Sequence, residues 1–118
     1  MESNSRWADI FRKLKEKGFN VYSPSTKTGE CKEKYLVVKN EGSTAHAVFS
    51  TDISFYSILV YVPRDKYSIL DEYVQEVKKC MKELYPMIIP YGSETPSTYD
   101  DSVKAHMVSI MYKNYKKC

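Results

Sequence analysis

The side chains whose types could do chemistry lie close together near the end of the chain. Asp100 and Asp101 precede His106 by a few residues, and two carboxylates beside an imidazole can hold a metal ion or act as a general base. A catalytic metal site usually needs three convergent protein ligands, and an Asp pair before a strand more often makes turn hydrogen bonds. The pattern therefore favours a turn, and we predict no catalytic residue, no bound metal and no other cofactor.

The cysteines do not form a reactive or metal-binding pattern. Cys31, Cys80 and Cys118 are an odd number of thiols without a CxxC pair, which predicts neither a disulfide framework nor a zinc site. We expect Cys80 to be buried in a helix, and Cys31 to lie in a polar loop without a neighbouring base. The chain also lacks GxSxG, P-loop and GxGxxG motifs. We therefore do not expect an enzyme.

Charge and hydropathy exclude further classes. The 118 residues carry a net charge of only +3, and Lys outnumbers Arg fifteen to three, which argues against specific nucleic-acid recognition. The charge is segregated, because residues 1–40 and 102–118 are basic and residues 41–101 are acidic. This pattern is typical either of scattered solvated charges or of complementary surfaces. No apolar run is long enough for a membrane span, so we expect a protein that stays in the cytoplasm or joins an assembly built there.

Two segments have the periodicity of amphipathic helices. In residues 5–17, Trp7, Ile10, Phe11 and Leu14 form one apolar stripe, and Ser3, Asn4 or Ser5 is the expected cap. Residues 67–85 form the stronger signal, where we expect Ser68 to act as the N-cap, supported by Asp71.

Four segments favour strands: 19–22, 35–39, 53–62 and 105–115. Residues 53–62 are apolar on both faces, which predicts a central strand covered on one side by a helix and on the other by a helix or a neighbouring subunit. We expect residues 40–43 to form a turn, whereas residues 44–52 are ambiguous. The predicted fold is a single α+β domain over residues 1–118, with two helices packed on a mainly antiparallel sheet of about four to five strands.

Tyrosine is unusually frequent among the aromatic residues, with 11 residues against four Phe and one Trp. Tyrosine suits half-exposed surfaces that meet a partner, and the two long loops, 23–33 and 90–102, also favour function by contact. The alternative is that half of the tyrosines are ordinary residues at the rim of the core. The residues that we predict at interfaces are Tyr56, Tyr61, Tyr91, Glu94, Tyr99, Asp100, Asp101, Lys27, Lys32 and Tyr112.

The second half of the chain resembles a family of small phage proteins. The similarity covers roughly residues 53–115 and is carried by patterns of strand, helix and strand. It includes Leu59-Val60-Tyr61-Val62-Pro63, Tyr67-Ser68-Ile69-Leu70, Leu84-Tyr85-Pro86, Glu94-Thr95-Pro96, Asp100-Asp101, Lys104-Ala105-His106 and Ser109-Ile110-Met111-Tyr112. These segments are similar to those of the tail terminator, or tail completion, proteins of tailed phages and phage-tail-like particles.

The resemblance implies a structural virion protein without an active site. It implies a homo-hexameric ring that caps the tail tube, stops polymerisation of the tube and joins the tail to the head connector. The implied partners are tail tube protein, connector protein and, in contractile tails, sheath protein. Three alternatives remain: a head-completion or stopper protein, a small nucleic-acid-binding module, and a small enzyme or metal protein centred on Asp100, Asp101 and His106.

Overall fold

The structure is a computed structural model, and it describes most of the chain. The described residues are 7–24, 29–46, 51–85, 87–92 and 95–117, with the backbone alone described for 43–46, 51–52 and 115–117. The expected caps Ser3, Asn4 and Ser5 lie outside the described residues.

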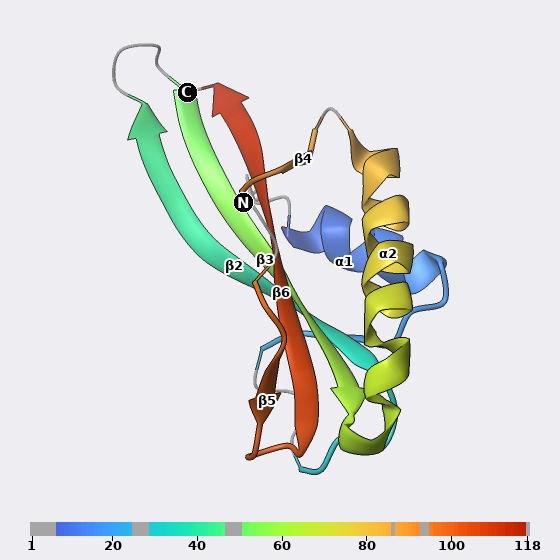
Figure 1. The fold of residues 1–118 in the computed structure, drawn as a ribbon. Helices are drawn as coiled ribbons and strands as arrows, with labels where there is room; N and C mark the ends of the chain where they lie inside the picture. The colour runs from blue at the N-terminus through green and yellow to red at the C-terminus, as the bar shows by residue number, and fades with distance from the viewer. Residues whose placement is uncertain (1–6, 25–28, 47–50, 86, 93–94, 118) are drawn as a thin grey trace.

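Three long antiparallel strands form the centre of the sheet, and β3 lies between the other two (Figure 1). Short strands extend it at both sides: β1 runs parallel to β2, while β4 and β5 pair antiparallel with opposite ends of β6. The strands are β1 (Val21–Tyr22), β2 (Tyr35–His46), β3 (Thr51–Pro63), β4 (Ile89–Pro90), β5 (Thr98–Asp100) and β6 (Ala105–Lys117). The fold is therefore α+β as predicted, with six strands and one parallel pair.

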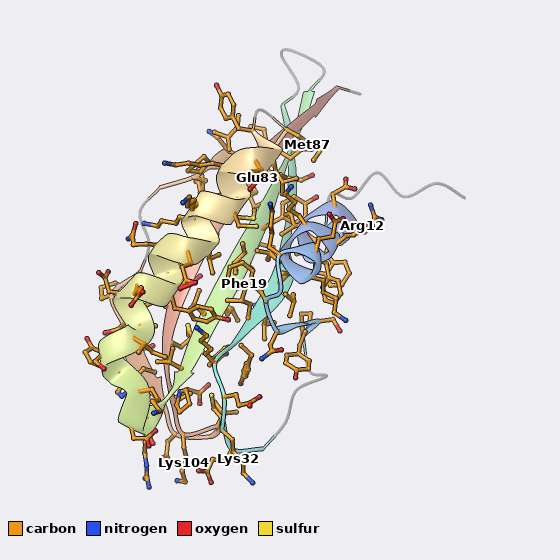
Figure 2. All side chains as sticks on the ribbon, turned by 90° about the vertical axis from the view of Figure 1, so that its right-hand side faces the viewer. Arg12, Phe19, Lys32, Glu83, Met87 and Lys104 are labelled. Carbon is orange, nitrogen blue, oxygen red and sulfur yellow. The ribbon has the colours of Figure 1, made fainter. Side chains whose placement is uncertain are left out.

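Both helices pack on the same face of this sheet (Figures 1 and 2). They are α1 (Trp7–Glu16) and α2 (Leu70–Met81), and 3₁₀ turns η2 (Arg64–Ile69) and η3 (Lys82–Leu84) flank α2. The core forms where their apolar stripes meet the alternate side chains of the long strands. Its fully buried members include Ile10, Leu14, Leu36, Val38, Ile58, Val60, Val74, Val77 and Met81.

The beginning of the second helix differs from the prediction. Ser68 lies inside η2, and Ile69 is the residue that precedes α2, without a side-chain capping hydrogen bond. The apolar stripe extends to Ile69 and Leu70, which pack on the core. The predicted cap at Ser68 was therefore wrong, because the chain leaves β3 through a 3₁₀ turn before the α-helix begins.

The segment 40–43 does not reverse the chain. It forms a bulge in β2, since the pairing with β3 shifts between Asn40 and Gly42 and then continues to the pair His46–Thr51. Gly42 has a φ of +99°, and its amide donates to the side-chain oxygen of Asn40 at 2.8 Å. The glycine was recognised from the sequence, but its role is to accommodate the extra residue of the bulge.

Candidate interaction surfaces

The face of the sheet opposite the helices is apolar, and no described helix covers it. On β3 the side chains of Tyr56, Ile58, Val60 and Val62 point to the helices and are buried, whereas those at alternate positions are half-buried. We call the other side the open face and define it by the half-buried side chains of β2, β3 and β6. Its apolar members are Val37, Ile53, Phe55, Leu59, Tyr61, Met107 and Met111, and the half-buried Ser109 and Lys113 also lie on it.

A polar contact interrupts the middle of the open face. Ser57 has 0% exposed surface, although it points to the side without helices, and its hydroxyl donates to Glu41 Oε2 at 2.5 Å. Glu41 belongs to the bulge of β2, and its other carboxylate oxygen lies 3.8 Å from Lys39 Nζ. The bulge thus carries a carboxylate over a buried hydroxyl in the middle of the open face.

A second, smaller cluster closes one end of the open face. Cys31, Tyr35 and Ala105 are buried there, with Tyr61 half-buried against them. The rings of Tyr35 and Tyr61 are 4.8 Å apart, and burial raises the pKa of the Tyr61 hydroxyl. The amide of Cys31 donates to the carbonyl of Val103 at 2.7 Å, which joins the expected loop 23–33 to the turn that precedes β6.

Tyr91 covers part of the other end of the open face. Its ring lies 5.0 Å from that of Phe55, and Lys113 Nζ lies 5.4 Å from its centroid. It is 43% exposed. The predicted interface residue Tyr91 is therefore a surface aromatic at the edge of the apolar strip.

Two of the predicted interface tyrosines belong to the core instead. Tyr56 and Tyr112 are only 1% and 3% exposed. They are directly opposite each other in the pairing of β3 with β6, on the side that the helices cover. The prediction that they lie at an interface was wrong, because the sequence does not show which face of a strand receives the helices.

Two exposed tyrosines flank α2, one at each end. Tyr85, at the C-terminal end, is 67% exposed, and Tyr67, at the N-terminal end, is 53% exposed. The ring centroids of Tyr67 and Tyr99 lie 4.7 Å and 5.3 Å from that of His106, whose Nε2 is 3.3 Å from the carbonyl oxygen of Arg64. His106 thus organises a pair of exposed tyrosines.

The two carboxylates expected near His106 make local contacts instead. Asp100 Oδ1 accepts hydrogen bonds from the amide and the hydroxyl of Ser102 at 3.0 Å and 2.6 Å, and Asp101 lies 3.6 Å from Lys104 Nζ. Among the described residues, no group of three or more His, Cys, Asp or Glu side chains could hold a metal ion. The site therefore has the geometry of a turn.

The remaining predicted interface residues fall into two groups. Lys32 is exposed, in the segment that Cys31 anchors. Lys27 and Glu94 lie outside the described residues.

The outer edge of β6 is occupied by the chain's own residues. β4 pairs at Lys113 and Tyr112, and β5 pairs at residues 105–107. Between them, the amide of Tyr91 donates to Met111 O and that of Thr95 to Ser109 O, each at 3.0 Å. This edge of β6 is therefore not open for pairing with another copy, because residues 89–92 and 95–100 return along it.

A groove of about 740 Å³ lies beside the C-terminal half of α2. Sequence analysis did not find it, because its walls come from α2, the segment after η3, and β6. Its described lining is mainly apolar, with lysines at the rim: Lys78, Met81, Lys82, Tyr85, Ile88, Pro90, Gly92, Ile110, Met111 and Tyr112.

Comparisons with known proteins identify no relative: no protein-family model matches the chain, and no curated protein matches it. None of the described helices is long and apolar enough to cross a membrane.

Proposed function

We propose that this chain is a structural virion protein of the tail terminator type, which forms a ring on the end of the tail tube. In this role the ring stops polymerisation of the tube and joins the tail to the head connector. The partners are other copies of the chain, the tube protein, the connector protein and, in a contractile tail, the sheath. The resemblance of residues 53–115 to this family motivates the proposal.

The open face is the observation that carries the proposal. The described helices cover only one side of the sheet, so Phe55, Leu59 and Met107 remain half-buried on the open face, and apolar side chains gathered on a surface favour a protein–protein contact. Burial of such a patch in an assembly would stabilise it by roughly 25 cal/mol per Å² of apolar surface. Asp100 and His106, whose side chains could act as a base or bind a metal, are engaged in local structural contacts.

The shape of the chain fits a ring component that contacts axial neighbours. The molecule is elongated, with principal extents of 48 × 29 × 25 Å, and β2, β3 and β6 extend beyond the helices at one end (Figure 1). The anchored segments around Lys32 and Asp101 lie at the opposite end. A copy placed in a ring can therefore present different surfaces to the tube and to the connector.

The decisive experiment is a capping assay with purified tube protein. We expect the chain to bind tube ends and to shorten the tubes that grow in its presence, with ring-shaped density at one end in electron micrographs. Leu59→Asp and Met107→Asp should abolish capping, because each places a charge in the apolar strip. Ala8→Asp, on the exposed side of α1, is the matched control and should cap normally. Unchanged tube growth with the folded wild-type chain would exclude the proposed function.

A further inference from the structure

The exposed charges of α2 are separated along its length. Asp71, Glu72 and Glu76 lie within its first seven residues and are exposed, and no basic residue lies between them. Lys78, Lys79 and Lys82 follow in the second half and in η3. The helix macrodipole favours acidic residues in the first turn and basic residues in the last turn. Here the charges are separated along the whole helix, which gives α2 one acidic and one basic surface.

The basic half of α2 borders the large groove. Lys78 and Lys82 are at its rim, and its floor is formed by the buried side chains of Met81, Ile88 and Ile110. None of its described lining residues is acidic. This chemistry fits an occupant that brings an apolar or aromatic side chain together with carboxylates.

An exposed aromatic side chain next to carboxylates is found at the N-terminal end of α2. Tyr67 precedes the helix, is 53% exposed and is held by its ring contact with His106 and by a hydrogen bond of 3.1 Å between its hydroxyl and that of Ser97. Asp71 lines the same shallow hollow as Tyr67. Arg64, Asp65 and Lys66 share this end, so the acidic surface is that of α2 itself.

We propose that the groove of one copy binds the Tyr67 end of α2 of a second copy, with Asp71 and Glu72 facing Lys82 at the rim of the groove and the exposed Lys79 beside it. The Tyr67 end and the groove lie at opposite ends of α2, so a head-to-tail contact leaves one of each free for the next copy. Repetition of such a contact produces a ring when the rotation closes. The inference deepens the proposed function by naming the lateral contact, and it rests on that function for the ring that the contact builds.

Charge reversal with rescue tests this contact. In sedimentation velocity at low salt, we expect the wild-type chain to form species larger than a dimer. Glu72→Lys and Lys82→Glu should each weaken self-association by about tenfold or more, because an attraction becomes a repulsion. The double variant, which restores opposite charges across the contact, should recover assembly. Tyr67→Ser should weaken it without rescue.

Glu16→Lys is the matched control, since it reverses an exposed charge on α1, and it should assemble like the wild type. Thermal unfolding of each variant verifies that the fold is intact. The inference is overturned if both single variants assemble normally or if the double variant fails to recover assembly. It is also overturned if the wild-type chain stays monomeric at all concentrations or assembles only to a dimer. If the single variants assemble and cap tubes like the wild type, this contact is wrong but the proposed function stands. If the double variant recovers assembly but no variant caps tubes, the contact stands and the tail terminator function is wrong.

Discussion

Lys13 Nζ lies 2.8 Å from Glu83 Oε1, and this ion pair connects α1 to the turn that ends α2. Lys17 Nζ approaches the other carboxylate oxygen at 3.2 Å. Figure 2 shows Glu83 at the end of α2 that lies beside α1. Residues far apart in the chain are thereby held together at the solvent side of the core.

Glu83→Gln should lower the melting temperature slightly near pH 7. The hydrogen bonds from Lys13 and Lys17 lower the pKa of Glu83 below its ordinary value of 4.5, so its stabilising effect is present above that value and is lost as the pH falls through the lower, folded-state pKa. The hydrogen bond to Glu83 likewise raises the pKa of Lys13, so its effect is lost only at strongly alkaline pH.

Thermal unfolding of wild type and variant at about pH 7 and pH 3 tests this expectation. The difference in melting temperature should be present at the first pH and smaller at the second, because protonation of Glu83 removes the ion pair. Added salt should also reduce it, since the pair is exposed. A difference that grew on acidification would contradict the assignment.

Trp7→Phe should cost about 0.5–1.5 kcal/mol of unfolding free energy. Trp7 Nε1 donates to the carbonyl oxygen of Val38 in β2 at 2.6 Å, and phenylalanine keeps the ring contact with Phe11, 4.8 Å away, but loses this donor. Urea denaturation followed by circular dichroism measures the change. Since Trp7 is the single tryptophan, its fluorescence in the wild-type chain reports separately on the docking of α1, and an emission unchanged by unfolding would contradict the half-buried position of its ring.

Ile58→Ala and Leu59→Ala should differ strongly, although the residues are neighbours on β3. Ile58 has 0% exposed surface and faces the helices, so its truncation should cost about 2–5 kcal/mol. Leu59 is half-buried on the open face, and its truncation should cost clearly less in the isolated chain. Chemical denaturation of both variants compares the two faces of the sheet, and equal losses would show that the open face is as well packed as the core.

Gly42→Val should destabilise the chain by about 1 kcal/mol or more, and Gly42→Asn by less. The φ of +99° is the reason, because β-branched residues avoid positive φ and asparagine tolerates it better. A Cβ at this position would meet no atom within 4 Å, so the cost comes from the backbone alone. Unfolding free energies of the two variants provide the test, and equal values would argue against a conformational role for this glycine.

Local sequence signals were sufficient for the elements whose periodicity is strong. The stripe containing Ile10 and Leu14 correctly predicted α1, and the apolar alternation around Ile58 correctly predicted a central strand. In contrast, Gly42 looks the same in sequence whether it ends a strand or forms a bulge, because only the partner strand determines if pairing resumes beyond it. Ser68 likewise has the composition of a cap, but the 3₁₀ turn that follows Pro63 places it outside that position.

The surfaces depended on contacts between distant segments. Tyr56 and Tyr91 are equally suitable for an interface by residue type, yet one is opposite Tyr112 under the helices and the other lies over Phe55 at the surface. The groove beside α2 has no counterpart in any single segment, since its residues come from three parts of the chain.

The sequence by itself determined the class of fold, the positions of the two helices and of the central strand, and the segregation of charge, because each follows from residue type and from spacing within a few residues. Only the tertiary structure decided that both helices cover one face of the sheet, that residues 89–92 and 95–100 close the edge of β6, and which tyrosines remain exposed. These features depend on which side of the sheet each connection crosses, and the free energy that selects that side comes from packing between residues far apart in the chain.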